Sequence, residues 1–416
     1  MVSEKFLPRG RLGLLALLCV PALGIAQEAP PFPILLQQAI TTAPIQLEQS
    51  ANIAALRSDA AQARAWMNPR IDAIAENLSA PSPDGTSQRQ NTYSVSQPLE
   101  LFGKRQARLD MADRNLDLAT MRGRQVRVVF AAELAEAYAI AEAGLLRSVL
   151  ASEELQRAND DLRATVALVN AGREANLRAA QARASVASAL AAERAARADA
   201  AQALEALTAL SGSQITFTGL GGTLLDAPRT PSQSNATDES PAVLAARAER
   251  DALRAQVEVE RKRTLPEVSV MAGTRRYGFS DATGYQLGLS FSVPLFDRNT
   301  HGIDASEQRV TAAEARLDNA RLLAQAQRRS AIVQVEAADL RLAAANEGLN
   351  AAMEAYRLGR IGYEAGRTSL VELLATRRSL SDANLVTIEA RLARVRAIAL
   401  LAQSEGRLAF SGEQTK

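Results

Sequence analysis

The sequence predicts a mainly helical protein that also supplies strands to a transmembrane β-barrel. Residues 284–293 alternate strictly between apolar and small polar side chains, which is the period-two pattern of a strand with two different faces. Much of the remaining chain is rich in Ala and Arg, with apolar residues at heptad spacing, which indicates very long helices. The same order of elements occurs twice. Each chain should therefore fold as a duplicated unit of helix, β-hairpin and long helical hairpin.

The first 26 residues resemble a secretory signal peptide. Basic residues are followed by an apolar run from Leu12 to Val20 and a small-residue site that ends at Ala26, where we expect cleavage. Lipidation of Cys19 is not expected, because Leu18 stands where a lipoprotein signal needs a small residue. Since Cys19 is the only cysteine, removal of residues 1–26 would leave a mature chain without disulfides or thiol chemistry.

Charge and composition exclude several classes of function. The 48 basic and 46 acidic residues leave a formal net charge of only +2, and both signs alternate along the helix faces, so binding to nucleic acid is not indicated. The short glycine segment 219–222 is no phosphate-binding loop, and no catalytic constellation is visible, so we expect neither an enzyme nor a cofactor. His301 is the only histidine. A threefold ring of this residue could bind metal, but a surface histidine is the favoured interpretation.

The first half of the mature chain spans 27–210. Pro98 should end its second strand, because proline cannot donate a ladder hydrogen bond. Gly172 should separate its two long helices, since glycine accepts the left-handed conformation at a helix end. The expected elements are a helix at about 34–66, strands at about 70–79 and 91–98, helices at about 104–169 and 173–210, and then a connector at 211–240 with a short strand at 215–217.

The second half, 241–406, repeats this order. Pro98 and Pro294 are 196 residues apart, and Gly172 and Gly366 are 194 residues apart, so the two halves form an internal structural repeat. The expected elements are a helix at 241–263, strands at about 267–277 and 284–295, helices at about 303–363 and 367–405, and a C-terminal tail at 407–416.

Four strands are too few to close a membrane barrel, and their edges would be unpaired in lipid. Three chains would supply twelve strands, enough for a barrel with an aqueous passage, and their helices would continue it as a coiled-coil tunnel. Asp72 and Glu76 fall on the lumen-facing parity and could favour cations, although an ordinary polar wall is the preferred interpretation. The residues expected to face lipid are Tyr285, Leu287, Leu289, Phe291 and Val293.

Two motifs carry a family resemblance. Gln97–Arg105 (QPLELFGKR) and Val293–Asn299 (VPLFDRN), together with the duplication, resemble the TolC-like outer membrane factor family, and within it the branch that serves heavy-metal cation efflux. The resemblance covers about residues 34–406. It implies a homotrimeric barrel and tunnel in the outer membrane, docked to a periplasmic adaptor (membrane fusion) protein and to a proton-driven inner membrane pump of the resistance-nodulation-division type. The strand-to-helix elbows would contain Pro98, Gly103, Pro294, Asp297, Arg298 and Asn299.

The resemblance also marks the two helical tips as adaptor contacts. Family members often carry Gly-x-x-Ser at the tip, and the second half has this motif at 366–369, whereas the first half has Gly-Arg-Glu-Ala at 172–175. The residues implied at the contact are Gly172, Arg173, Gly366, Arg367, Thr368 and Ser369.

Two alternatives remain open. Heptads alone would also suit a secreted or periplasmic coiled-coil structural protein, and a duct of this kind could export drugs or other small molecules in place of metals. A charge introduced at Leu289 separates a duct from a soluble coiled coil, because only the duct needs that side chain in lipid.

Overall fold

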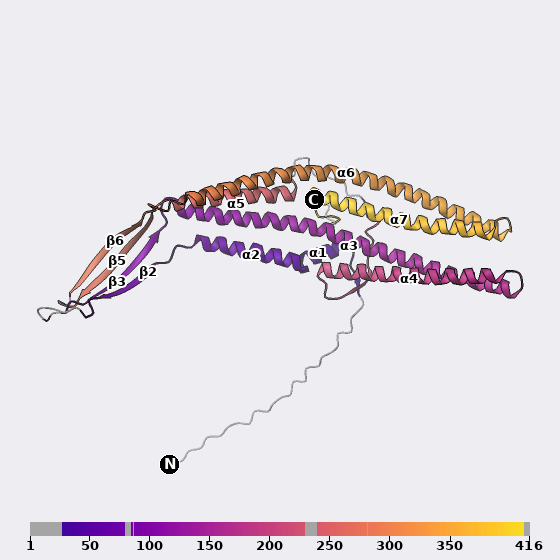
Figure 1. Cartoon of the computed structure of the whole chain (residues 1–416), viewed down its shortest axis with the longest axis horizontal. Helices are drawn as coiled ribbons and strands as arrows, with labels where there is room; N and C mark the ends of the chain where they lie inside the picture. Colours follow the sequence, from indigo (N-terminus) through magenta and orange to yellow (C-terminus); the bar gives the residue numbers. More distant parts are fainter. Residues whose placement is uncertain (1–26, 80–84, 86, 229–238, 281, 412–416) are drawn as a thin grey trace, which may run out of the picture.

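In the computed structural model the chain is elongated, with a β-sheet at one end and long helices along the rest (Figure 1). The structure describes residues 27–79, 85, 87–228, 239–280 and 282–411. The predicted signal peptide, most of the loop between the first two strands and part of the connector lie outside the described residues. Within the described ranges, none of the helices combines the length and the apolar character needed to cross a membrane.

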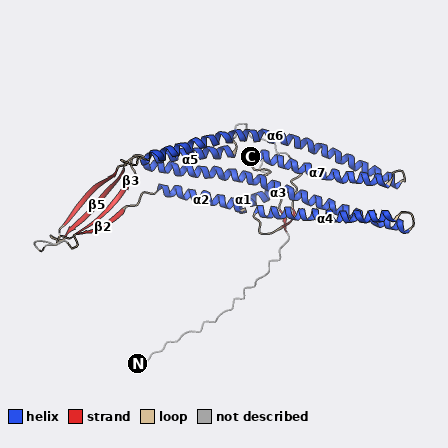
Figure 2. Cartoon of the chain, viewed as in Figure 1, coloured by secondary structure: helices blue, strands red, loops and turns tan. Residues whose placement is uncertain are grey.

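The sheet joins the hairpins of the two halves. Its strands are β2 (Arg70–Glu76), β3 (Gln90–Leu99), β5 (Glu267–Tyr277) and β6 (Thr283–Ser292), in the spatial order β2-β3-β5-β6. Every neighbouring pair is antiparallel, and the strands lie side by side in Figure 2. The pairing of β3 with β5 is the contact that unites the two halves, and it leaves β2 and β6 at the edges.

Three strand ends differ from the sequence prediction. β3 continues one residue beyond Pro98, to Leu99, and Pro98 itself is paired with Ser269. β2 stops at Glu76, because Asn77 adopts a left-handed conformation with φ 52°. β6 stops at Ser292, so Val293, which was predicted as a lipid-facing strand residue, lies just outside the strand. Pro294 follows it and has no amide hydrogen with which to extend the ladder.

Each half contains a long helix and a returning partner. α3 (Lys104–Asn170) and α6 (Thr300–Glu364) contain 67 and 65 residues, so each is about 100 Å long at 1.5 Å per residue. α4 (Asn176–Ser211) and α7 (Leu370–Ser404) run back beside them. α3 also packs against α5 (Pro241–Arg263) and α7, so it is the helix that connects both halves below the sheet.

The N-terminal helix is divided, where the sequence predicted one continuous helix at 34–66. α1 (Phe32–Thr42) and α2 (Pro44–Arg64) are separated by Ala43, whose ψ of 133° is extended. A residue that precedes proline is driven out of the helical region by the proline ring, while proline itself suits the first helical position. The Ala43-Pro44 pair is therefore the cause of the break.

A small parallel sheet at mid-length holds the beginning of the described chain. β1 (Gln27–Ala29) pairs with β4 (Phe217–Leu220). The glycine segment 219–222 permits this approach: a Cβ on Gly221 would lie 3.1 Å from the carbonyl oxygen of Ala29. The sequence placed a short strand slightly early, at 215–217, and did not predict β1. Segment 219–222, which the sequence analysis excluded as a phosphate-binding loop, thus has a packing role.

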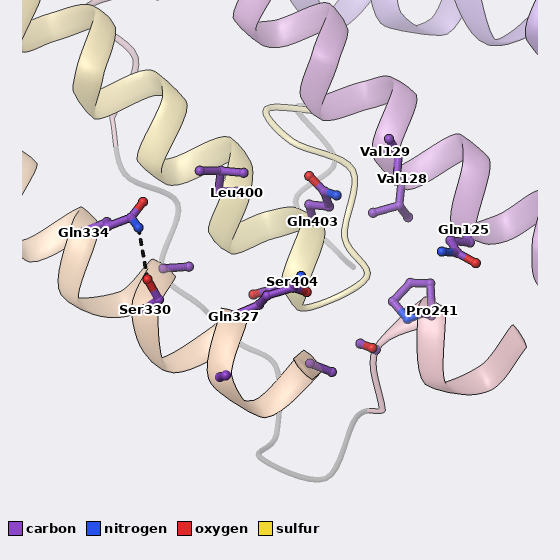
Figure 3. Close-up of a pocket in the computed structure, with 15 residues that line it drawn as sticks. Gln125, Val128, Val129, Pro241, Gln327, Ser330, Gln334, Leu400, Gln403 and Ser404 are labelled. Atoms are coloured by element: carbon purple, nitrogen blue, oxygen red, sulfur yellow. Dashed lines mark hydrogen bonds between the residues drawn. The ribbon is translucent and has the colours of Figure 1, made fainter. Parts of the chain in front are cut away.

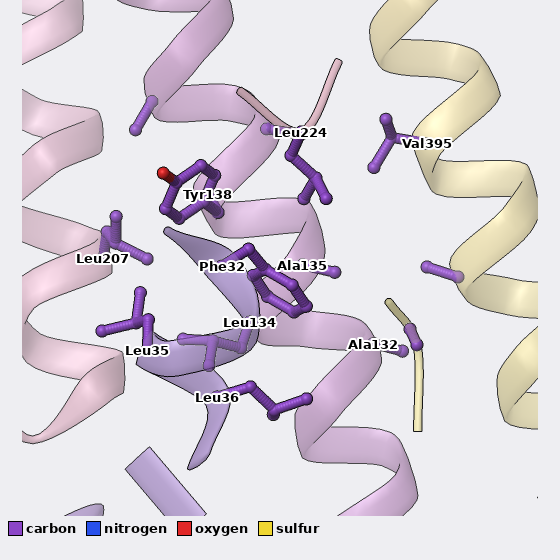
Figure 4. Packing of buried hydrophobic residues seen from close by; sticks show 14 of the residues in the cluster. Phe32, Leu35, Leu36, Ala132, Leu134, Ala135, Tyr138, Leu207, Leu224 and Val395 are labelled. Atoms are coloured by element: carbon purple, nitrogen blue, oxygen red, sulfur yellow. The ribbon is translucent and has the colours of Figure 1, made fainter. Parts of the chain in front are cut away.

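The main apolar core lies beside this sheet, around the middle of α3 (Figure 4). Tyr138 is completely buried, and its ring meets that of Phe32 edge-on at 5.8 Å. Phe32 also contacts Phe410, so part of the predicted C-terminal tail packs against the core. Buried members of this core include Phe32, Leu36, Phe130, Leu134, Tyr138, Leu207, Leu225 and Val395.

Candidate functional site

The four-stranded sheet exposes its apolar face. The register aligns Leu287 with Ala272, and Ala272 with Val95, so one face of the sheet is apolar across β3, β5 and β6. Tyr285 and Leu287 are each 87% exposed. Leu289 and Phe291 lie on the same face and are also exposed. Water disfavours such a surface, which therefore requires an apolar environment.

The opposite face of the sheet is mostly polar, and it is enclosed along β3. Thr92 is 4% exposed and Ser94 is 5% exposed, although both carry hydroxyl groups. Neighbouring atoms lie so close on this face that a Cβ on Gly273 would lie 2.6 Å from the carbonyl oxygen of Tyr93 and 2.9 Å from the side-chain nitrogen of Gln286. Glycine is therefore required at position 273. The arrangement is the reverse of a water-soluble sheet, in which the apolar face is covered.

Both acidic residues that the sequence assigned to the lumen have arginine partners. Asp72 accepts a hydrogen bond from Arg70 at 2.8 Å, and Glu76 lies 3.8 Å from Arg275. Arg275 also donates a hydrogen bond to Thr92. These pairs balance the charge of the polar face locally. The cation-favouring role of Asp72 and Glu76 stays a prediction.

The two strand-to-helix elbows share a backbone conformation. Gly103 precedes α3 with φ 79°, and Asn299 precedes α6 with φ 51°, so each long helix begins after a left-handed residue. Asn299 can adopt this conformation because its side chain is held: its amide donates to the carboxylate of Glu260 at 2.9 Å and to the Glu260 carbonyl oxygen at 3.1 Å. Pro98 and Pro294 stand at the strand side of the same elbows.

Glu260 joins α5 to the second elbow. Burial opposes ionisation of this carboxyl group, but hydrogen bonds from Asn299, Gln256 and Arg263 outweigh it, and the pKa of Glu260 lies below its usual value. The ionised carboxylate is therefore the form that holds the elbow. Sequence reasoning missed it, because Glu260 lies 39 positions before Asn299.

The two helical tips have the same backbone. Gly172 and Gly366 both have φ 69°. The Gly172 and Arg173 amides donate to the carbonyl oxygens of Val169 and Leu168, both at 2.9 Å. Gly366 and Arg367 make the corresponding bonds at 2.9 and 2.8 Å, to the carbonyl oxygens of Tyr363 and Gly362. Both turns are Schellman motifs, in which glycine supplies the left-handed residue.

The side chains at the tips differ. Ser369 caps α7, since its hydroxyl oxygen accepts the amide hydrogen of Glu372 at 3.3 Å, whereas Ala175 gives α4 no side-chain cap. The returning helices begin at Asn176 and Leu370, later than the predicted 173 and 367. Gly172, Arg173, Gly366, Arg367 and Ser369 are exposed and Thr368 is half-buried, and their contact with an adaptor stays a prediction.

Ion pairs connect α3 to α7 on the way to the tips. Arg377 bonds Glu154 at 2.6 Å and Asp161 at 2.8 Å. Burial lowers the pKa of Arg377, but these two acceptors outweigh it and raise the pKa overall. Arg396 bonds Glu136 at 2.8 Å farther from the tip. Sequence analysis did not predict these ion pairs between α3 and α7, because the paired residues are more than 200 positions apart.

His301 and one internal cavity are the remaining candidate sites for a ligand. His301 is exposed on the first turn of α6, and the part of the chain that the structure describes contains no group of three or more His, Cys, Asp or Glu side chains arranged for a metal ion. A cavity of about 420 Å³ lies between α3, α5, α6 and α7 (Figure 3). Its lining is neutral, and Gln334 donates to Ser330 within it at 3.0 Å. The cavity thus offers amides and hydroxyls to a ligand.

Comparison with known proteins agrees with this architecture. The chain is 57% identical to the nickel-cobalt-cadmium resistance protein NccC of Alcaligenes xylosoxydans xylosoxydans over 420 residues, which cover 98% of this chain and 96% of that protein. It is also 57% identical to the nickel and cobalt resistance protein CnrC of Cupriavidus metallidurans, over 98% of each chain.

Solved structures have the same fold. The channel protein CusC superimposes with a TM-score of 0.77 at 16% identity, covering 92% of this chain and 96% of that one. The outer membrane protein VceC from Vibrio cholerae gives 0.73 at 18% identity, covering 90% and 96%. The family description "Outer membrane efflux protein" matches residues 35–213 and 233–407. This chain belongs to the outer membrane efflux protein family.

Proposed function

We propose that three copies of this chain form the outer membrane duct of a tripartite efflux system that exports divalent metal cations such as nickel and cobalt. The observation that carries the proposal is the inverted sheet, with exposed apolar side chains on one face and a mostly polar face, enclosed along β3, on the other. Lipid would cover the first face and water would fill the passage along the second.

The trimer follows from the sheet edges. β2 and β6 each have one unpaired side in a single chain, and unpaired backbone groups are costly in hydrocarbon. Pairing β6 of one copy with β2 of the next would close a ring, and three copies would give a barrel of twelve strands. Exposed leucines on α6, namely Leu322, Leu323 and Leu340, would then pack against the helices of neighbouring copies.

The substrate class rests on the two relatives, which are named for resistance to nickel and cobalt. The described polar face contains hydroxyl groups, glycines and balanced ion pairs, so a hydrated cation would pass along it by diffusion. Selectivity would then reside in the inner membrane pump and the periplasmic adaptor. Export of drugs or other small molecules is the second substrate class to be tested.

The tips would be the adaptor contact. Both project at the end of the molecule opposite the sheet (Figure 1), and both have a hydrogen-bonded glycine turn with an exposed arginine next to it. Gly172, Arg173, Gly366, Arg367, Thr368 and Ser369 would meet the adaptor there.

The experiment uses a bacterium that lacks the outer membrane component of its nickel-cobalt efflux system. The full-length chain should restore growth in nickel and cobalt and should be recovered as trimers from the outer membrane. Leu289→Arg should abolish both, since a charge at the bilayer midplane costs about 2 to 4 kcal/mol per chain. Leu289→Ile is the matched control and should behave as wild type. Recovery of a soluble monomer would contradict the duct, and restored growth only in drugs would contradict the metal substrate.

A further inference from the structure

The elbow Pro294–Asn299 exposes a phenylalanine and an arginine that the rest of the fold does not use. Phe296 is 100% exposed. Arg298 is exposed and has no ion pair or hydrogen bond with any residue that the structure describes. The neighbouring Asp297 is already engaged, because its carboxylate accepts the amide hydrogen of Asn299 at 2.9 Å. An aromatic ring and a free guanidinium thus stand two positions apart on one short loop.

This loop continues the exposed apolar face of the sheet. Phe291 lies on that face, and Val293 and Leu295, which follow the end of β6, are exposed as well. The connections 65–69 and 100–103, at the same end of the sheet, also expose apolar side chains. The side chain of Gln97, in β3, donates a hydrogen bond to the carbonyl oxygen of Met67 at 2.8 Å and so links β3 to the first of these connections. The resulting band of exposed apolar side chains consists of Trp66, Met67, Leu101, Phe102, Leu295 and Phe296.

Basic groups lie on the helix side of this band. The guanidinium of Arg105 stands 5.1 Å from the ring centre of Trp66, and the ammonium group of Lys104 is 3.6 Å from Glu267. Aromatic side chains and long basic side chains gather in this order where the hydrocarbon of a membrane meets its phosphate groups. Arg298 differs from the other two because its guanidinium has no partner in the described chain.

We propose that the elbow 294–299 binds a phospholipid of the periplasmic leaflet, with Phe296 among the acyl chains and Arg298 on the phosphate of a glycerophospholipid. This inference rests on the proposed outer membrane duct. A guanidinium and a phosphate form short charge-assisted hydrogen bonds, which makes phosphate the fitting ligand for a free arginine next to an apolar surface.

The duplication indicates that each chain has one such site. At the corresponding positions of the first elbow, 196 residues earlier, Glu100 replaces Phe296 and Phe102 replaces Arg298. Glu100 is directed inward, where its carboxylate accepts a hydrogen bond from Arg108 at 2.9 Å. The first elbow therefore has an exposed ring without the free arginine.

Tryptophan fluorescence can test the position of Phe296, because Trp66 is the only tryptophan of the chain. In the full-length Trp66→Phe protein, Phe296→Trp, Leu289→Trp and Arg173→Trp place single probes at the elbow, the sheet and a tip. The proteins are reconstituted in phosphatidylglycerol vesicles that carry a spin label at carbon 5 or carbon 12 of the acyl chain. The Phe296→Trp probe should be quenched about twofold more by the shallow label, Leu289→Trp should favour the deeper one, and Arg173→Trp should respond only to aqueous acrylamide.

Lipid retention tests Arg298. Arg298→Ala should lower the phosphatidylglycerol retained by the purified protein about fivefold, and Arg298→Lys should keep most of it. Inorganic phosphate at millimolar concentration should not displace the lipid. Unchanged retention in Arg298→Ala overturns the phosphate contact. If Leu289→Trp is quenched by lipid and Phe296→Trp is not, the elbow is covered by a second copy and this proposal is wrong, while the duct stands. If neither is quenched by lipid, the duct itself is contradicted.

Discussion

The sheet and the mid-length core solve the same physical problem in opposite ways. In the core, apolar side chains such as Phe130 and Leu134 are buried and exclude water. In the sheet, the apolar side chains are exposed and the hydroxyl groups of Thr92 and Ser94 are enclosed. One chain thus contains a region that shields its apolar side chains from water and a region that presents them to lipid. The elbows lie between the two regions.

The largest effect should come from emptying the core. Phe130→Ala should lower the free energy of unfolding by about 3 to 5 kcal/mol, because it removes buried contacts and leaves a cavity. Leu287→Ala, on the exposed face of the sheet, should change the stability of the detergent-solubilised protein by less than about 0.5 kcal/mol. Thermal unfolding followed by circular dichroism measures both. Equal losses of stability in the two variants would show that Leu287 is as important for folding as the buried Phe130, and would contradict this difference between the sheet and the core.

The boundary between the regions should be sensitive to acid. The lowered pKa of Glu260 means that its carboxylate stabilises the fold above the unfolded-state pKa of about 4.3, and that this contribution is lost as the pH falls through the lower folded-state value. Glu260→Gln should therefore cost about 1.5 to 3 kcal/mol at pH 7, since it removes hydrogen bonds to a charged group. Melting curves of the variant and the wild type should converge toward pH 3, and a constant difference would contradict this assignment.

A larger side chain at Gly273, on the polar face of the sheet, should destabilise the protein. Gly273→Ala should destabilise the sheet by about 1 to 3 kcal/mol, because the new methyl group would meet the backbone of β3 at 2.6 Å. Gly348→Ala on α6 is the control: nothing lies within 4 Å of its added Cβ, and the variant should gain up to about 1 kcal/mol in helix propensity. Heat resistance of the assembled protein on electrophoresis would report both changes.

The smallest effect concerns the polar group inside the core. The Tyr138 hydroxyl donates to the carbonyl oxygen of Gly222 at 3.0 Å, so Tyr138→Phe should cost about 1 kcal/mol. Burial and the nearby Glu142 raise the pKa of Tyr138 to about 12. Because the folded pKa exceeds the usual value near 10, this contribution is complete below pH 10 and is lost as the pH rises toward 12. Ultraviolet titration should show one tyrosine that ionises after the others.

Much of the architecture could be predicted from periodicity. The bounds of β5 were predicted to the residue, and the long helices were placed within a few residues, because period-two and heptad patterns continue over many positions. The parity of Tyr285, Leu287, Leu289 and Phe291 identified the apolar face of the sheet. The proline motifs pointed to the efflux family, and the comparisons confirm that resemblance.

Other features depend on partners that are distant in sequence. β1 has three residues and acquires its structure only from β4, about 190 positions later. The Arg377 pairs and the Asn299–Glu260 contact likewise have no local pattern. The break at Ala43 did have a local signal, the following proline, but the continuous apolar spacing outweighed it in the prediction. The roles of the elbow, sheet and tip residues in lipid and adaptor contact stay predictions.

The parallel sheet of β1 and β4 has a practical consequence for handling the protein. Gln27 and Phe410, close to the two ends of the described chain, lie at mid-length beside the same core, far from the sheet and from the tips (Figure 1). A label or purification tag attached next to either of these two residues would emerge at mid-length of the molecule. Both mouths of the assembled duct would stay free, so tagged protein is suitable for measuring transport and docking.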